Sequence, residues 1–317
     1  PSELAPATSR VLARLVPEYL DPAAVRVVEG DAAVTQDLLA QGFDHALFTG
    51  GTEVGKKIMA AAAPTLTPVT LELGGKSPVI VAADADLDVA ARRIAWVKLL
   101  NSGQTCIAPD YVLAERSIAD ELVDKIVSNV REFRSGESDP SLRIVNQRQF
   151  DRLVSLISAT DGTIVTGGEF DSATLQIEPT VIVDPSPTDA VMADEIFGPI
   201  LPVVTVDSLD SAVDFVNDKP KPLALYLFTQ SRRVARTLID RIPSGGAVVN
   251  HVAMHCMVPQ LPFGGVGASG MGAYHGRWGF EAMSHRRAVL AKRARPDLKM
   301  MYPPYSDRAI KLMRKVF

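Results

Sequence analysis

The sequence predicts an α/β protein with a doubly wound parallel sheet and a second α/β unit that begins near residue 75. Short apolar runs alternate with amphipathic helical segments, and a glycine turn near residue 50 joins a strand to a helix. The length of 317 residues suits about two domains. Hydrophobic residues make up 47% of the chain and charged residues 22%, which together supply a large core and a soluble surface.

The first 74 residues carry the strand and helix pattern of the first unit. The spacing of apolar residues predicts helices over 7–20, 31–41 and 55–63. Compact apolar runs predict strands over 25–28, 45–48 and 69–73. Pro22 ends the first helix, and the turn Thr49-Gly50-Gly51-Thr52 precedes the third.

Residues 75–283 carry the strand and helix pattern of the second unit, and the segment after them differs from both units. Helices are predicted over 86–101, 118–134, 208–217 and 231–241. Strands are predicted over 79–81, 181–183, 201–206, 224–228 and 247–250. From 284 to 317 the chain holds ten Lys/Arg residues against two Asp residues, and Pro303-Pro304 interrupts any helix. We therefore divide the chain into 1–74, 75–283 and 284–317, the last being a tail or an arm on a partner subunit.

Charge and cysteine content exclude several classes of protein. With 33 basic and 37 acidic side chains the net charge is −4, which gives no electrostatic case for nucleic-acid binding. No apolar run reaches the roughly 18 residues of a membrane-spanning helix. Binding of the basic tail to a membrane surface stays a minor alternative, because the final helix is short and such binding usually needs a second anchoring signal. Two cysteines cannot build a disulfide framework, so we expect a cytoplasmic protein.

The first motif of chemical interest is the glycine turn within 48–56, Phe-Thr-Gly-Gly-Thr-Glu-Val-Gly-Lys. A strand leads into this turn and the turn opens a helix, whose free N–H groups and positive dipole end suit a phosphate group. The spacing does not match a P-loop, which needs a longer loop and a Gly-Lys-Ser/Thr end. A purely structural turn is the alternative, because glycine turns are common at such junctions.

Two further motifs carry a candidate base and a candidate nucleophile. In Leu-Glu72-Leu-Gly-Gly-Lys76-Ser-Pro, a carboxylate ends an apolar strand, where burial raises its pKa towards that of a base at neutral pH. Taken alone, the motif favours the alternative that Glu72 pairs with Lys76. In Asn101-Ser-Gly-Gln-Thr-Cys106, small and polar residues follow a helix and end in a thiol, which suits an activated nucleophile. A small buried hydrophobe is the alternative for a single cysteine.

Three other motifs are weaker. The segment Asp194-Glu-Ile-Phe-Gly-Pro199 combines an acid, an aromatic ring and a rigid turn, which suits a sugar diol and a flat ring, or else a plain loop. The segment 265–270 matches G-x-G-x-x-G, but no strand precedes it, so we reject it as a dinucleotide-binding fingerprint. Cys256 lies near His255 and His251, but no Cys-x-x-Cys is present. We therefore interpret Cys256 as a packing residue and predict no metal site.

The ordered set of motifs resembles the aldehyde dehydrogenase superfamily over essentially the whole chain. The resemblance rests on Leu-Glu72-Leu-Gly-Gly-Lys-Ser-Pro, Gly-Gln-Thr-Cys106, Glu195-Ile-Phe-Gly-Pro and Pro262-Phe-Gly-Gly-Val-Gly-Ala-Ser-Gly270. Met271-Gly-Ala-Tyr-His-Gly276 and Tyr302-Pro-Pro-Tyr305 resemble the class 3 branch, which includes fatty, aromatic and coniferyl aldehyde dehydrogenases.

The resemblance implies a Rossmann-like cofactor domain, of which 1–74 is the remainder, and a catalytic thiol domain over 75–283. It implies that Cys106 is the nucleophile and Glu72 the general base. The residues implied to bind NAD, or NADP, are Glu3, Thr49, Gly50, Gly51, Thr52, Val54, Gly55, Glu195 and Phe197. Within this set Glu3 and Glu195 are implied to bind ribose hydroxyls, and Phe197 to pack near the nicotinamide. His275 is implied to line the substrate channel.

The resemblance also implies a reaction, partners and an unusual start. The expected reaction is NAD(P)-dependent oxidation of an aldehyde to an acid, in a homodimer or a higher homo-oligomer. Gly51 departs from the serine usual in the family, so a side-chain contact to phosphate is lost there. No Asn donor of the family's oxyanion hole precedes Pro1, so we expect an N-terminally truncated chain. The alternative is an inactive fragment or a non-catalytic homologue that serves assembly.

Overall fold

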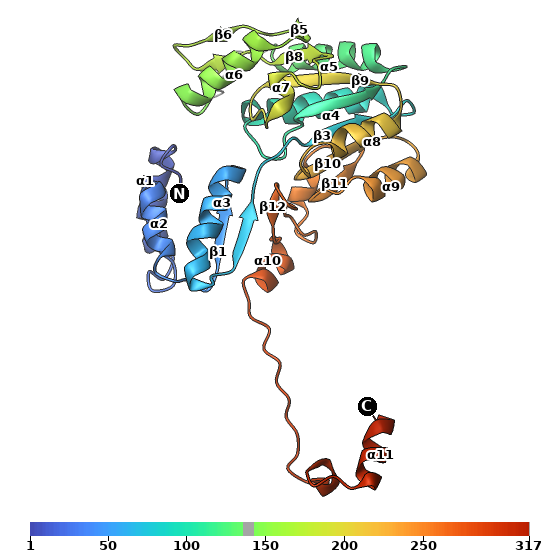
Figure 1. Cartoon of the computed structure of the whole chain (residues 1–317). Coiled ribbons are helices and arrows are strands. Elements are labelled where there is room, and N and C mark those ends of the chain that lie inside the picture. Colours follow the sequence, from blue (N-terminus) through green and yellow to red (C-terminus); the bar gives the residue numbers. More distant parts are fainter. Residues whose placement is uncertain (136–142, 317) are drawn as a thin grey trace. The chain divides into compact units, whose positions relative to one another are not determined.

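The computed structural model describes residues 1–135 and 143–316, and these form two units (Figure 1). The first unit is Pro1–Met283 and the second is Ser284–Phe317. The second unit contains η4 (Lys299–Met301) and α11 (Asp307–Val316). No helix in the described part of the chain is long and apolar enough to cross a membrane.

A three-stranded sheet holds the first residues of the candidate site. β1 (Ala46–Thr49) pairs in parallel with β2 (Val69–Glu72), and α3 (Thr52–Ala62) with η1 (Ala63–Thr65) connects them. The third strand, β12 (Gly270–Met271), comes from the far end of the unit and runs antiparallel to β2. In this register Thr49 and Gly270 lie on either side of Glu72. The helices α1 (Pro6–Tyr19) and α2 (Ala32–Leu39) precede this sheet in the chain.

A seven-stranded sheet forms the larger part of the first unit. In spatial order its strands are β11 (Gly246–Val249), β10 (Ala224–Phe228), β3 (Pro78–Val81), β4 (Tyr111–Glu115), β9 (Ile200–Val206), β8 (Thr180–Val183) and β5 (Thr163–Thr166). All neighbouring pairs are parallel except β5 with β8. The remaining short elements are η2 (Leu100–Gly103), β6 (Phe170–Asp171), β7 (Gln176–Ile177), α7 (Ala190–Ala193), η3 (Met254–Met257) and α10 (Gly276–Ala282).

Helices cover both faces of the large sheet, as the alternation of its buried side chains shows. Val79 and Val81 of β3 belong to one core cluster, which also takes in α4 (Leu87–Leu99) and α5 (Ala119–Phe133). Ile80, between them, belongs to the opposite cluster with α6 (Gln147–Ala159), α8 (Leu209–Asn217) and α9 (Arg232–Arg241). Since successive strand residues point to opposite faces, the sheet is buried on both sides, as is usual for a parallel sheet. The predicted doubly wound α/β class is confirmed.

Side-chain caps fix the starts of these helices. Asp86, Asn146, Ser208 and Ser231 each accept a hydrogen bond from the N–H three residues ahead, at the starts of α4, α6, α8 and α9. Such a cap satisfies one of the N–H groups left unpaired at a helix start. At α4, α8 and α9 the predicted helical segments begin within a few residues of these caps because the polar cap and the apolar periodicity coincide.

Some sequence-based predictions differ from the structure. The predicted strand over 25–28 is wrong, since this segment is irregular and pairs with no strand in the described residues. Val25 and Val28 are 41% and 44% exposed, so the apolar run has no sheet to join. Conversely, β4 and α6 were not predicted, although β4 is central in the sheet and wholly buried apart from its last residue.

The linker 73–77 joins the end of β2 in the small sheet to the start of β3 in the large sheet. β2 ends at Glu72 and the chain passes through Gly74-Gly75-Lys76 into the start of β3. The loops that precede β4 and β9 lie at the same edge of the large sheet as the start of β3, because the three strands are parallel. Two of these loops are in direct contact, since a Cβ on Gly103 would lie 2.2 Å from the carbonyl oxygen of Gly198.

Replacing Gly103 should therefore destabilise the protein. Its φ of +71° is left-handed, and an alanine there would also collide with the backbone of Gly198. We expect Gly103→Ala to lower the free energy of unfolding by about 2 kcal/mol or more, from backbone strain and overpacking together. Gly51→Ser is the control, because Gly51 has a φ of −73° and open space around it. Denaturant unfolding that leaves both variants equally stable would contradict the proposed packing of the two loops.

Candidate active site

Glu72 is a buried carboxylate without a partner. It is the last residue of β2 and is 3% exposed. Within the described residues, neither of its carboxylate oxygens has a hydrogen-bond partner. Burial raises the pKa of Glu72 to about 7, because the charged form loses its hydration. The predicted alternative, in which Glu72 pairs with Lys76, is wrong, since Lys76 is bound to Asp110 instead.

Cys106 lies in the turn between η2 and β4, where its half-buried side chain packs against the core. The pKa of its thiol is raised to about 11, mainly by burial and further by the carboxylates of Glu195 and Glu72. The structure thus brings Cys106, Glu72 and Glu195 within electrostatic range of one another. At neutral pH the thiol keeps its proton, whereas the carboxyl group of Glu72 titrates near that pH.

The loop that carries Cys106 has an unusual backbone. Asn101, Ser102 and Gly103 have φ values of +50°, +53° and +71° in succession. The Asn101 amide donates to the carbonyl of Gln104 at 3.0 Å, and the Gln104 amide donates back to the carbonyl of Asn101 at 3.1 Å. The Gln104 side chain also accepts from the N–H of Val145 at 2.9 Å. The left-handed conformation costs free energy for residues other than glycine, so the surrounding contacts must hold the loop in this form.

Glu195 approaches the linker between the two sheets. The backbone N–H of Gly75 interacts with the Glu195 carboxylate and lowers its pKa. A Cβ on Gly74 would lie 1.8 Å from Oε2 of Glu195, so only glycine permits this approach. The pKa of Glu195 is raised to about 8, first by burial and then by the nearby Asp110 carboxylate. The motif that contains Glu72 and Gly74 and the motif over 194–199, which were identified separately in the sequence, therefore lie in contact.

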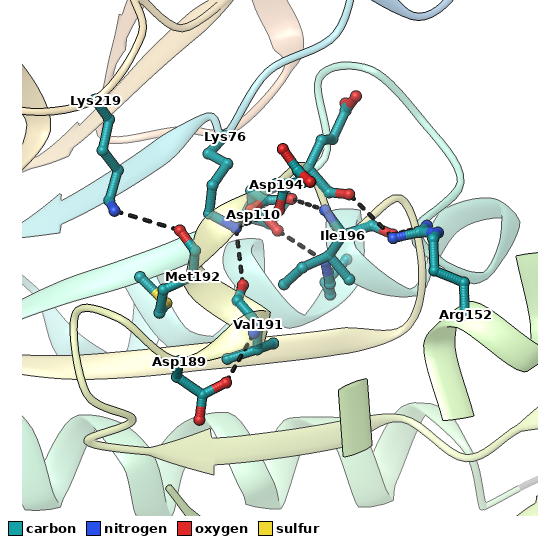
Figure 2. Close-up of polar contacts among 12 residues, drawn as sticks. Lys76, Asp110, Arg152, Asp189, Val191, Met192, Asp194, Ile196 and Lys219 are labelled. Atoms are coloured by element: carbon teal, nitrogen blue, oxygen red, sulfur yellow. Dashed lines mark hydrogen bonds and ion pairs between the residues drawn. The ribbon is translucent and has the colours of Figure 1, made fainter. Parts of the chain in front are cut away.

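A buried ion pair holds the loop that carries Glu195 (Figure 2). Lys76 Nζ lies 2.5 Å from Asp110 Oδ2, and the two side chains are 8% and 4% exposed. Lys76 also donates to the carbonyls of Val191 at 2.9 Å and Asp194 at 2.8 Å. The other oxygen of Asp110 accepts from the N–H of Ile196 at 2.9 Å. Every donor of the Lys76 ammonium group is thus satisfied, as a buried charge requires.

Two further cations support this loop from other elements. Arg152 of α6 donates to the carbonyls of Glu195 at 3.3 Å and Ile196 at 2.5 Å. Lys98 of α4 is buried and donates to the carbonyl of Pro109 at 3.0 Å, next to Asp110. Burial lowers the pKa of Lys98 to about 8. No motif in the sequence points to Asp110 or Arg152, whereas the position of Lys98 on the apolar face of the helix predicted over 86–101 is a signal for a buried lysine.

The glycine turn forms the start of α3, as predicted. Gly51 is the N-cap residue and provides no side-chain cap, and a Cβ there would meet nothing within 4 Å. Thr49, Gly51 and Val54 are exposed, whereas the Thr52 hydroxyl donates to the carbonyl of Ala268 at 3.0 Å. Gly55 is buried, and a Cβ there would lie 2.6 Å from Cδ2 of Leu73, so its role in the fold is close helix packing. Gly50 is half-buried and donates to the carbonyl of Glu72 at 3.0 Å.

The remaining predicted residues lie in different environments. Phe197 is 37% exposed and has a φ of +48°. His275 stacks on Phe263 at 5.2 Å and 18°. Glu3 is exposed ahead of α1, and the contacts of the described residues do not connect it with the glycine turn. No group of three or more His, Cys, Asp or Glu side chains in the described ranges is arranged to bind a metal ion.

Comparison with known proteins decides the family. A model described as the aldehyde dehydrogenase family matches residues 1–289. The chain belongs to the aldehyde dehydrogenase family. It is 50% identical to "Aldehyde dehydrogenase family 3 member A2" of Mus musculus over 315 residues, which cover 98% of this chain and 65% of that protein. It is 48% identical to "Aldehyde dehydrogenase, dimeric NADP-preferring" of Mus musculus, covering 96% of this chain and 68% of that protein.

Solved structures of aldehyde dehydrogenases share the fold. The substrate-bound state of Staphylococcus aureus AldH has a TM-score of 0.95 and 42% identity, and covers 100% of this chain and 70% of its own. An NAD-dependent aldehyde dehydrogenase from Sinorhizobium meliloti has a TM-score of 0.82 and 31% identity, and covers 92% and 60% of the two chains. The chain therefore spans about two thirds of the length of the family members it matches.

The buried ion pair predicts a large difference between two aspartates. Asp110→Asn leaves the Lys76 ammonium group buried without its anion, which typically costs about 3–5 kcal/mol of stability. Asp207→Asn is the matched control, because Asp207 pairs with Arg116 at the surface, where an ion pair contributes little. We expect denaturant unfolding to show a strong loss of stability for Asp110→Asn and almost none for Asp207→Asn. Equal stability of the two variants would contradict the structural role of the Lys76–Asp110 pair.

Proposed function

We propose that this chain carries the nucleophile and the general base for NAD(P)-dependent oxidation of an aldehyde to a carboxylic acid. Cys106 is the nucleophile and Glu72 is the base. The observation that carries the proposal is the buried, unpartnered Glu72 carboxylate within electrostatic range of the Cys106 thiol. A carboxylate with a pKa near 7 is suited to take and release a proton at neutral pH.

The first stage joins the aldehyde to Cys106. Ionised Glu72 takes the proton of the thiol and releases it to solvent, the Cys106 sulfur bonds to the carbonyl carbon, and the carbonyl electron pair moves onto oxygen to give the thiohemiacetal in its alkoxide form. When bound, the nicotinamide ring supplies the acceptor for the hydrogen that leaves this carbon with its electron pair. The carbonyl then re-forms and the acyl group stays on Cys106 as a thioester.

The second stage releases the acid. Ionised Glu72 takes a proton from a water molecule, and the water oxygen bonds to the thioester carbon. The carbon–sulfur bond breaks, and the Cys106 sulfur leaves with the electron pair. Glu72 then gives this proton to the Cys106 sulfur, which regenerates the thiol and the ionised carboxylate.

The residues around this pair fit a dinucleotide. The start of α3 offers uncapped N–H groups at an open glycine, Gly51, which suits a pyrophosphate group. Glu195 lies against Gly74 with a carboxylate suited to ribose hydroxyls, and Phe197 presents an exposed ring. Glu3 favours NAD by opposing a 2′-phosphate, although NADP also suits the other residues.

The same proposal assigns roles to the segments and to the partner. Residues 1–74 belong to the cofactor domain, 75–283 form the catalytic domain, and 284–317 form a tail used in oligomerisation. We propose a homodimer or a higher homo-oligomer. The aromatic side chains of Phe263, Tyr274 and His275 lie in contact with one another and suit a medium-chain or aromatic aldehyde.

The two cysteines provide the test. Cys106→Ser should abolish aldehyde-dependent reduction of the cofactor, because a hydroxyl is a far weaker nucleophile than a thiolate at neutral pH. Cys256→Ser is the matched control and should retain most of the activity. The assay measures NADH or NADPH formation with a panel of aldehydes, together with inactivation by iodoacetamide. Inactivation that follows alkylation of Cys256 instead of Cys106 would contradict the proposal.

A further inference from the structure

Tyr274 is held near Glu72 by the backbone of the segment that follows β12. Gly270 lies opposite Glu72 in the β2–β12 pair, and a Cβ on Gly272 would lie 3.1 Å from Oγ1 of Thr70. The chain then turns, and Tyr274 exchanges two backbone hydrogen bonds with Phe263, at 2.8 and 3.0 Å. The position of Tyr274 is therefore fixed by β2 on one side and by Phe263 on the other.

The ring of Tyr274 packs against the same core as the nucleophile. Tyr274 and Cys106 are both partly buried against one hydrophobic cluster, which includes Ile107 and Phe263. The ring meets Phe263 edge to face at 5.8 Å and 89°, and His275 at 4.5 Å and 74°. These contacts hold the ring while its hydroxyl group stays within electrostatic range of Glu72 and Cys106.

The Tyr274 hydroxyl is an available hydrogen-bond donor. It makes no hydrogen bond with the described residues, whereas the nearby Tyr226 hydroxyl already donates to the carbonyl of Ile107 at 2.6 Å. Burial raises the pKa of Tyr274, and the charges of Glu72 and Cys106 raise it further. The group therefore keeps its proton at neutral pH while it lies within electrostatic range of the proposed nucleophile.

We propose that Tyr274 is a further catalytic residue, whose hydroxyl donates a hydrogen bond to the aldehyde oxygen as the Cys106 sulfur bonds to the carbonyl carbon. The proposal rests on the function proposed above. As the carbon–sulfur bond forms, the carbonyl electron pair moves onto oxygen, and the Tyr274 O–H stabilises this charge without giving up its proton. Donors directed at a developing oxyanion are among the largest single contributions to catalysis.

The test is Tyr274→Phe, which removes the hydroxyl and keeps the ring contacts. We expect kcat/KM for aldehyde oxidation to fall about a hundredfold, the scale reported for loss of one oxyanion donor. The rate of Cys106 alkylation by iodoacetamide should stay close to that of the unmodified protein, because alkylation forms no oxyanion. Tyr305→Phe, in the second unit, is the matched control and should leave both rates unchanged.

The outcomes separate this inference from the proposed function. Aldehyde oxidation at the unmodified rate in Tyr274→Phe would overturn the inference and leave the proposed function intact. Equal losses of oxidation and of alkylation would also overturn it, because the hydroxyl would then act by positioning the thiol. Absence of aldehyde oxidation in the unmodified protein would overturn the proposed function itself, and the inference with it.

Discussion

The buried ion pair between Lys76 and Asp110 is the interaction on which the candidate site depends. It joins the linker after β2 to the start of β4, and both partners also bind the backbone that carries Glu195. Removing two charges from water costs several kcal/mol for each ion, so the pair persists only because its other hydrogen bonds are made. The same linker contributes Gly74, against which the Glu195 carboxylate packs, and Gly75, whose backbone N–H lowers the pKa of that carboxyl group.

The protonation states of Glu72 and Cys106 follow from their position, where a strand of the small sheet ends and a strand of the large sheet is about to begin. Glu72 ends a strand of the small sheet, and Cys106 precedes a strand of the large one. Burial at this junction raises the pKa of both groups, to about 7 for the carboxylate and about 11 for the thiol. Neither shift would suit catalysis alone. Under the proposed function, the two shifts together give a thiol that stays protonated until a base acts, and a base that titrates near neutral pH.

The sequence predicted the fold class well because helix caps and apolar periodicity agree along most of the chain. It failed for residues 25–28, where local apolar character was not matched by a pairing strand. For the site, each motif alone was ambiguous, and only their order pointed to Cys106 and Glu72. The supporting network was not predictable, because Lys76, Asp110 and Arg152 are far apart in the chain and only the fold brings them to the loop that carries Glu195. Sequence proximity even favoured the wrong partner for Lys76.

The central claim is that ionisation of Glu72 controls hydrolysis of a thioester on Cys106. Rapid mixing of aldehyde and cofactor with the Glu72→Gln protein tests it most directly. A burst close to one reduced cofactor per site is expected, followed by turnover that is slower by about 10²–10⁴-fold, the usual contribution of a general base. In the unmodified protein the slow step should accelerate as pH rises through about 7, because Glu72 then loses its proton. Steady turnover of Glu72→Gln at the unmodified rate, without a burst, would contradict the claim.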